Sequence, residues 1–379
     1  MLEIRGKYNS AIIYNDNVEQ SALSQIYALL NNEVSIGSKI RIMPDVHAGA
    51  GCVIGYTATL TNKIIVNLIG VDIGCGITSI CIGKKDIDFQ KLDDIIHTYV
   101  PSGHNVHTSQ SGGEWIQKDF KKSSIYDDVR KICEKQDQDF NRVMASLGSS
   151  GGGNHFCEVD KDQDGLLWLT VHSGSRNFGL KIANYWQSIA KAKTHGTEGT
   201  MNGLEYLKDE DYQGYLTDMM IAQIYAHKNR EYILQQIQEK MDLVYGDGRS
   251  VESVHNYIDL DHEIIRKGAI SAMLNEPVII PWNMRDGLII GTGKGNPDWN
   301  FSAPHGAGRI MGRQVAKKSL QLSDFEDSMK GIWTSCVSKD TIDESPMAYK
   351  PYEEIQDLIG DTVDIKYTLK PVYSFKANE

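Results

Sequence analysis

The sequence predicts a mixed α/β (α+β) fold in one domain over residues 1–379, and three observations support this prediction. Short runs rich in Val and Ile, typical of buried strands, occur at 64–66, 77–82, 166–171, 278–280 and 288–290. Apolar residues recur at helical spacing at 21–30, at 126–144 and, most clearly, at 212–241. Candidate site residues extend from about residue 45 to residue 376, which favours one integrated domain over two separable ones.

The composition is that of a globular protein. The chain is 41% hydrophobic and 23% charged, and it contains no apolar run long enough to cross a membrane. Its first residues lack the apolar stretch of a signal peptide, so we expect a cytoplasmic protein without a membrane segment. The six cysteines form no CxxC pair, which argues against a disulfide framework and against a structural zinc site.

The net charge bears on possible partners. At −11, it argues against a protein that coats nucleic acid non-specifically, because phosphate contacts need clustered Lys and Arg. It leaves room for a local basic groove, and it suits a site that holds several divalent cations.

Five residues in glycine-rich or strand-ending segments are candidate metal ligands. They are Asp72, Cys75, His155, His172 and His255. Asp72 and Cys75 follow an apolar strand, and the adjacent glycines let the backbone turn so that both side chains can point the same way. The alternative is a strand-ending turn with a buried cysteine, and each histidine taken singly can be an ordinary core or surface residue.

The three histidines share a second feature. Each has a hydrogen-bonding neighbour in the sequence, namely Asn154, Ser173 or Asn256, and metal-bound imidazoles need such orientation. The mixture of carboxylate, thiolate and imidazole suits Zn²⁺, Mn²⁺ or Fe²⁺. Two ions sharing Cys75 are also possible, since phosphoryl transfer often uses a pair of metals. The other histidines, at 97, 104, 107, 195, 227 and 262, lie in polar loops or on helices and are interpreted as structural or solvated.

His305 is the candidate nucleophile. It follows Pro304 and precedes Gly306, Ala307, Gly308 and Arg309, and the residues 309–319 read as a helix. A glycine turn that opens a helix is a ready anion site, and neutral imidazole can attack phosphorus. The structural alternative is a capping turn in which His305 only bonds the backbone.

Taken together, these motifs resemble the RtcB family of RNA ligases. Pro44-Asp45-Val-His47, Gly70-Val-Asp72-Ile-Gly-Cys75, Asn154-His155, His172-Ser-Gly-Ser-Arg176, Arg266-Lys-Gly and His305-Gly-Ala-Gly-Arg309 occur in the family's order. The resemblance implies a single α/β domain with a β-rich core, flanking helices and a central metal cleft. It also implies a GTP- and Mn²⁺-dependent ligase that joins an RNA 3′-phosphate or 2′,3′-cyclic phosphate to a 5′-hydroxyl, in RNA repair or tRNA splicing.

The resemblance also assigns roles. It implies that the five donors bind two Mn²⁺ ions, that Cys75 serves both, and that His305 becomes guanylylated. It implies phosphate contacts for Asn154 and for the 306–309 turn, an RNA phosphate contact for Arg176, and guanine contacts for Glu158, Tyr349 and Lys376. Asp45 and His47 receive no assigned role.

The sequence departs from the RtcB family pattern at two places, and three alternative functions stay open. Pro304 stands where many members have Cys, and 283–287 replaces a Gly-Ser-Met-Gly type segment, so the chain resembles a compact bacterial branch. The enzymatic rivals are a metallo-phosphoesterase and an enzyme that caps nucleic-acid 3′-phosphates with GMP without sealing. The third is an RNA-end or metal-binding accessory protein. A release-factor-like helper is possible, and a monomer is expected.

Overall fold

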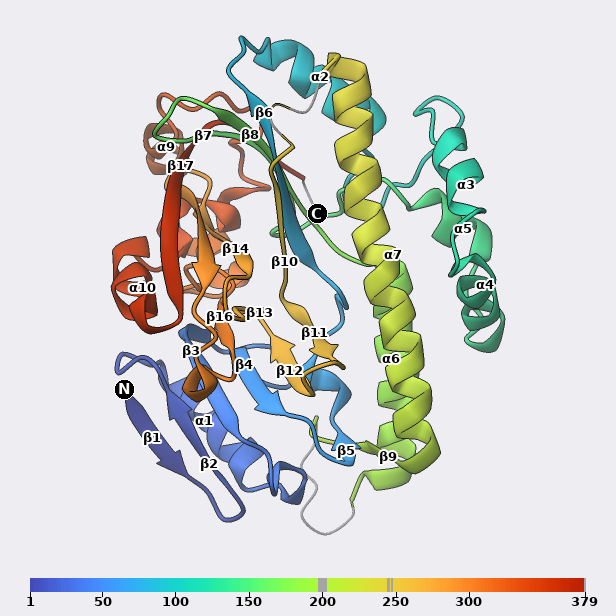
Figure 1. The fold of residues 1–379 in the computed structure, drawn as a ribbon, viewed down its shortest axis with the longest axis vertical. Helices are drawn as coiled ribbons and strands as arrows, with labels where there is room; N and C mark the ends of the chain where they lie inside the picture. The colour runs from blue at the N-terminus through green and yellow to red at the C-terminus, as the bar shows by residue number, and fades with distance from the viewer. Residues whose placement is uncertain (197–202, 244–245, 247, 378–379) are drawn as a thin grey trace.

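The computed structural model describes residues 1–196, 203–243, 246 and 248–377, and it has the predicted mixed α/β architecture (Figure 1). A six-stranded sheet has the spatial order β1 (Leu2–Arg5), β2 (Ser10–Ile13), β3 (Ile40–His47), β4 (Ile54–Thr59), β12 (Ile264–Lys267) and β11 (Asn256–Asp259). A seven-stranded sheet has the order β10 (Ser250–Val254), β6 (Gly76–Gly83), β8 (Leu167–Ser173), β7 (Phe156–Lys161), β17 (Val363–Lys376), β15 (Gly287–Gly293) and β14 (Pro277–Asn283). Two short pairs join β13 (Ala269–Ser271) to β16 (Ser302–Pro304) and β5 (Lys63–Ile64) to β9 (Leu207–Lys208).

The seven-stranded sheet curls until its two edge strands meet. The Ile279 amide of β14 donates to Ser253 Oγ of β10 at 3.1 Å, so each edge is partly covered by the other. Covering its edges in this way protects a sheet from pairing with other chains.

The helices lie outside the sheets. They are α1 (Gln20–Leu30), α2 (Phe89–Tyr99), α3 (Glu114–Phe120), α4 (Tyr126–Lys135), α5 (Phe140–Ala145), α6 (Arg176–Thr194), α7 (Asp209–Met241), α8 (Arg313–Ser319), α9 (Leu322–Ser328) and α10 (Tyr352–Leu358). The long α7 runs beside β6 and β10, and α6 lies along its lower half (Figure 1). None of the helices in the described ranges is both long and apolar enough to span a membrane.

Apolar packing fixes α7 against the seven-stranded sheet. Ile233 and Ile237 of α7 are fully buried in one cluster with Leu169 and Val171 of β8. Burial of each such side chain contributes about 1.5–3 kcal/mol. Because these residues recur at helical spacing, the same pattern that predicts the helix also fixes the face that it buries.

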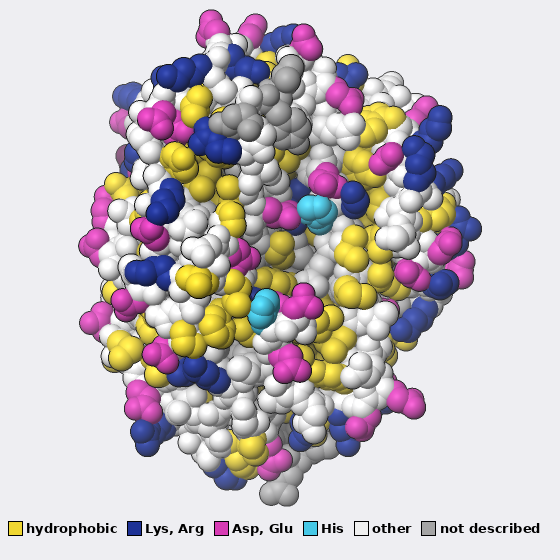
Figure 2. Space-filling view, viewed as in Figure 1, with side chains coloured by type: hydrophobic (Ala, Val, Ile, Leu, Met, Phe, Trp, Pro, Cys, Tyr) yellow, Lys and Arg dark blue, Asp and Glu magenta, His cyan; other side chains and the backbone are white. Residues whose placement is uncertain are grey.

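The charged side chains on the surface are distributed as the net charge of the sequence leads us to expect. On the face drawn in Figure 2, basic and acidic side chains are interspersed rather than gathered into one broad area. Contact with a polyanion on this face would therefore have to be local.

Most predicted elements are confirmed. The strands predicted at 77–82, 166–171, 278–280 and 288–290 are β6, β8, β14 and β15, and the helices predicted at 21–30 and 212–241 are α1 and α7.

Three predicted elements need correction. The strand at 64–66 ends at Ile64, and Val66–Leu68 form a short 3-10 turn. The helix at 126–144 is broken into α4 and α5, because Asp137 has φ 52° and Asp139 caps α5 by accepting from the amides of Asn141 and Arg142. The helix at 309–319 begins only at Arg313, because the backbone of Arg309 bridges to Tyr349 and Gly312 remains extended.

Candidate active site

Strand register brings the candidate ligands to one end of the seven-stranded sheet. Gly76, the first residue of β6, lies opposite Ser173 in β8 and Val254 in β10. Phe156, the first residue of β7, lies opposite His172 and Lys376. Antiparallel pairing therefore places Cys75, His155, His172 and His255 together, although they are far apart in the chain.

The five predicted donors form a continuous cluster. His155 Nε2 lies 3.0 Å from Asp72 Oδ2 and 3.3 Å from Cys75 Sγ. His172 Nε2 lies 3.2 Å from Cys75 Sγ and 3.0 Å from His255 Nε2. The donors form two groups that share Cys75, one with Asp72 and His155 and one with His172 and His255, and within each group the ligand atoms lie within 4.8 Å of one another.

Backbone carbonyls orient two of the imidazoles. His155 Nδ1 donates to the Ser150 carbonyl at 2.8 Å, and His172 Nδ1 donates to the Asn154 carbonyl at 3.1 Å. In the neutral imidazole a proton on Nδ1 leaves Nε2 with a free lone pair, and both Nε2 atoms lie near Cys75 Sγ. This is the arrangement that metal-binding histidines need.

Burial sets the charge state of the cluster in the absence of a cation. Burial, together with neighbouring imidazoles, holds the pKa values of His172 and His255 well below the usual range. Burial and the Asp72 carboxylate raise the pKa of Cys75. Burial would raise the pKa of Asp72 as well, but hydrogen bonding and charge from His155 lower it to about 2.

This donor set fits divalent cations. Donors that share one ion with bonds of about 2.0–2.3 Å stand about 3–4 Å apart, as these do. A cation would also take the place of the hydrogen bond between His172 Nε2 and His255 Nε2 and favour the Cys75 thiolate. The donor set therefore fits a divalent cation, and Cys75 is the residue common to both donor groups.

His305 lies beside this cluster and pairs with Asp45. His305 Nδ1 is 2.7 Å from Asp45 Oδ2, and the Asp45 side chain is fully buried whereas His305 is 18% exposed. The carboxylate holds the proton on Nδ1, which leaves Nε2 as the basic and nucleophilic atom. The ring centroids of His305 and His255 are 4.9 Å apart, so the candidate nucleophile adjoins the donor cluster.

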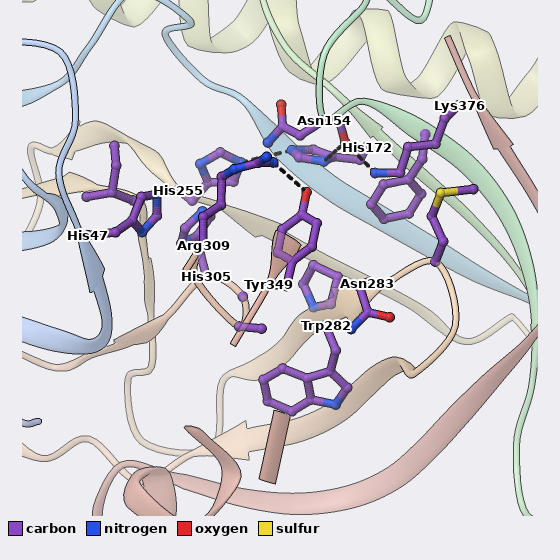
Figure 3. A pocket seen from close by; sticks show the side chains of 18 of the residues that line it. His47, Asn154, His172, His255, Trp282, Asn283, His305, Arg309, Tyr349 and Lys376 are labelled. Carbon is purple, nitrogen blue, oxygen red and sulfur yellow. Dashed lines mark hydrogen bonds between the residues drawn. The ribbon is translucent and has the colours of Figure 1, made fainter. Parts of the chain in front are cut away.

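His305 and part of the donor cluster line one cavity of about 270 Å³ (Figure 3). His47, His255 and His305 stand on one side of it, Lys376 stands on the other, and Arg309 and Tyr349 lie between them (Figure 3). Gly308 closes the turn after His305 with φ +75°, and a Cβ there would lie 2.2 Å from the Asp45 carbonyl oxygen. Only glycine therefore fits this position.

Comparison with known proteins agrees with this geometry. A family model described as tRNA-splicing ligase RtcB matches residues 29–377. The chain belongs to the RtcB family. It is 31% identical to the RNA-splicing ligase RtcB of Escherichia coli K12, over 89% of this chain and 90% of that protein. It is 29% identical to RNA-splicing ligase RtcB2 of E. coli ATCC 25922 (95% and 93%) and 26% identical to the tRNA-splicing ligase RtcB of Pyrobaculum aerophilum (83% and 82%).

The structure gathers the nucleotide residues implied by the RtcB resemblance into the His305 cavity. Asn154, Glu158, Arg309, Tyr349 and Lys376 all line it, as do the residues of the 306–308 turn. Glu158 accepts from Ser374 Oγ at 2.7 Å, and burial raises its pKa although Lys376 opposes the rise. The Asn154 backbone carbonyl accepts from both His172 and Lys376.

Glu344, which the sequence reasoning missed, connects several of these residues. Its Oε1 lies 3.2 Å from Arg309 Nη1 and 2.5 Å from Arg313 Nη1, and its Oε2 accepts from Tyr349 Oη at 2.6 Å and Lys376 Nζ at 3.0 Å. Burial would raise the pKa of this carboxyl, but the three cations hold it at about 2. A single buried carboxylate therefore fixes four side chains at the wall of the cavity.

Arg176 stands apart from this cavity. It lines a second one, of about 800 Å³, together with Asp72, His155 and Arg142. Its backbone has φ 56°, and its side chain donates to Ser149 Oγ and to the Gly103 carbonyl. The donor cluster thus contributes to both cavities, with His172 and His255 in the one that contains His305, and Asp72 and His155 in the one that contains Arg176.

For His155 and His172, the hydrogen-bond partners expected from the sequence are different in the structure. The Asn256 side chain bonds the Gly268 amide and the Asp72 carbonyl, and Ser173 Oγ donates to the Ser150 carbonyl. The orienting groups for His155 and His172 are carbonyls instead. Because α8 begins at Arg313, its N-terminus does not open at His305, and the amides near the nucleophile belong to a turn.

Asp45 and Glu344 differ in the local sequence signal that could identify each of them as a functional residue. Asp45 lies with His47 in a motif to which the sequence assigns no role, and its local signal is a carboxylate beside a glycine-rich segment. Glu344 has no such signal, because an acidic residue before a Ser-Pro turn is common on surfaces. Its burial is a consequence of tertiary packing alone.

Proposed function

We propose that this RtcB-family protein is a GTP- and Mn²⁺-dependent RNA ligase that joins a 3′-phosphate, or a 2′,3′-cyclic phosphate after hydrolysis, to a 5′-hydroxyl. The observation that carries the proposal is the 2.7 Å contact between buried Asp45 and His305, which lines one cavity with His172 and His255. A histidine oriented by a buried carboxylate beside a metal cluster suits covalent transfer at phosphorus better than hydrolysis alone.

In the first step, His305 Nε2 attacks the α-phosphorus of GTP. The new N–P bond forms as the bond to pyrophosphate breaks, and pyrophosphate leaves with the electron pair. The imidazole gains positive charge in this step, and the Asp45 carboxylate stabilises that charge. The amides of the 306–308 turn and Arg309 are proposed to receive the phosphate oxygens, and Asn154 to contact the triphosphate.

In the next steps, GMP passes from His305 to the RNA 3′-phosphate, and the 5′-hydroxyl then displaces GMP to form the phosphodiester. Arg176 is proposed to bind an RNA phosphate in the second cavity, which also contains Asp72 and His155. Two Mn²⁺ ions held by Asp72, Cys75, His155, His172 and His255 would supply charge neutralisation and Lewis-acid polarisation of the phosphates.

Guanine selection is proposed to depend on Glu158, Tyr349 and Lys376. Glu158 can accept from the ring N–H groups of guanine, whereas adenine offers a different pattern of donors and acceptors. Arginine and lysine side chains held by Glu344 lie close enough to balance the charge of the phosphates.

The remaining proposals concern partners and organisation. We propose a monomeric, cytoplasmic enzyme of one domain over 1–379, assisted in some reactions by a release-factor-like helper. The six free cysteines, all buried, are compatible with a reducing compartment.

The first experiment is intact-mass measurement after incubation with GTP and Mn²⁺, with ATP and Mn²⁺, and with GTP and a chelator. We expect a GMP-sized gain only with GTP and metal, absent from His305→Ala and labile in acid. A gain that persists in His305→Ala would mean that another residue is the nucleophile. No gain in the wild type would favour a metallo-phosphoesterase.

The second experiment separates sealing from capping. RNA pairs with a 3′-phosphate and a 5′-hydroxyl should be joined, and pairs with a 3′-hydroxyl and a 5′-phosphate should not. Accumulation of a 3′-GMP cap without joining, on RNA or DNA, would identify the enzyme as a capping enzyme.

A further inference from the structure

The middle of α7 carries a buried arginine that reaches the backbone behind the donor cluster. Arg230 is fully buried. Its Nη1 donates to the Gly74 carbonyl at 2.8 Å and to the Ser173 carbonyl at 2.9 Å. Gly74 directly precedes Cys75 and Ser173 directly follows His172. One guanidinium nitrogen therefore donates to backbone carbonyls next to two of the donors.

The rest of the guanidinium reaches a third donor-bearing strand. Arg230 Nε and Nη2 lie 3.0 and 2.7 Å from Glu252 Oε1, and Glu252 belongs to β10, which ends just before His255. The fit is close, because a Cβ on Gly76 would lie 3.3 Å from Arg230 Cζ. The planar fork of arginine suits this set of acceptors, whereas the single ammonium of lysine cannot span them.

The preceding residue of α7 performs a similar role for the fourth donor. Asn229 Oδ1 accepts from the amides of Gly148 (2.8 Å) and Ser149 (3.1 Å), and its Nδ2 donates to the Ser149 and Gly174 carbonyls. The segment held in this way continues to Ser150, whose carbonyl accepts from His155 Nδ1. Asn229 thus fixes the group that sets the tautomer of His155.

A buried ion pair by itself is weak evidence for a functional role, because it often contributes little to stability. The arrangement around Arg230 differs in that its acceptors include the carbonyls of residues adjacent to donors on two separate strands. A carbonyl fixed on each strand fixes the direction of the neighbouring side chain. Donors placed in advance lose less conformational freedom when an ion binds.

We propose that Asn229 and Arg230 of α7 are positioning residues for the metal cluster, holding the strands of Cys75, His155, His172 and His255 in ligating geometry. This inference rests on the proposed metal site. It assigns to α7 the task of preorganising the cluster from outside the substrate cavities, since neither residue lines them.

The test is Mn²⁺ titration of the metal-free, full-length protein by calorimetry, with electron paramagnetic resonance of the bound ion. The variants are Arg230→Lys, which keeps the charge, and Arg230→Met with Glu252→Gln, which removes both charges together. The control is Arg266→Met with Asp259→Asn, which removes another fully buried arginine and its carboxylate partner, 3.0 Å apart. Arg266 bonds Ser302, Phe301 and Tyr257, and none of its hydrogen bonds goes to a residue directly beside Cys75, His172 or His255.

We expect both Arg230 variants to bind Mn²⁺ about 10- to 100-fold more weakly, the range typical for groups that orient metal ligands, with an altered resonance spectrum. The control should stay within about twofold of wild type at a comparable loss of melting temperature. Asn229→Ala, which alters no charge, should weaken binding and keeps the test available if the Arg230 variants do not fold. Wild-type affinity in folded Arg230 and Asn229 variants would overturn the inference, as would equal losses in the control. Absence of Mn²⁺ binding by the wild type would instead refute the metal site of the proposed function.

Discussion

Replacing Asp45 with Asn tests the geometry of the nucleophile most directly. Asp45 Oδ2 lies 2.7 Å from His305 Nδ1, and the Asp45 carboxylate is fully buried. The substitution keeps the size of the side chain and removes the charge that stabilises the imidazolium formed during attack. An asparagine that turns its amide toward Nδ1 also shifts the ring proton to Nε2, the atom that must attack.

The size of the effect follows from the bond that is lost. A hydrogen bond to a charged group contributes about 1.5–3 kcal/mol. Since each 1.36 kcal/mol is a factor of ten in rate, adduct formation should slow about 10- to 160-fold. The upper part of this range is expected, because burial of the carboxylate strengthens its interaction with the ring.

The assay is the rate at which GMP becomes attached to the protein at saturating GTP and Mn²⁺, followed by intact mass. Asp93→Asn is the matched control, because Asp93 is also buried and accepts from Tyr373 and Ser335, which do not line the His305 cavity. The control should keep the wild-type rate within about twofold. If Asp45→Asn folds and forms the adduct as fast as the control, the orienting role of Asp45 is refuted.

Three further predictions address the metal, the fold and pH. Cys75→Ala should lose Mn²⁺ binding and ligation while keeping its circular dichroism, because Cys75 belongs to both donor groups; wild-type metal content with full ligation would contradict the shared-ligand geometry. Gly308→Ala should lower the melting temperature and abolish the adduct, because the new Cβ would lie 2.2 Å from the Asp45 carbonyl oxygen. Gly312→Ala is the control and should be tolerated, because a Cβ at Gly312 would have no atom within 4 Å. Hydrogen bonds that His227 donates to the Glu231 and Glu252 carboxylates raise its pKa to about 9. Its stabilising charge is therefore fully present below pH 6.5 and is lost as pH rises through 9. The melting-temperature gap between wild type and His227→Gln should therefore be largest near pH 6 and close above pH 9; a gap that does not change with pH would show that the ion pairs do not stabilise the fold.

Local sequence determined the elements whose signal is short-range. The periodicity of α7 and the Val- and Ile-rich strands β6, β8, β14 and β15 each appear within one segment, and the structure has all of them. The break between α4 and α5 was missed, because a left-handed Asp137 and a capping Asp139 compete with helical periodicity that continues across them. The late start of α8 was missed because it depends on a backbone bridge to Tyr349, 40 residues further along the chain.

For the site, the sequence by itself determined which donors and which nucleophile to consider, and it identified the family through its motifs. Residue types in glycine-rich turns carry that information, because the chemistry of a thiolate, imidazole or carboxylate belongs to the side chain. Only the tertiary structure decided which other residues orient these donors and the candidate nucleophile. Asp45 behind His305, Glu344 among four polar side chains and Arg230 behind the cluster are each far in sequence from what they orient. Such partnerships arise from strand register and helix packing, so no local pattern marks them.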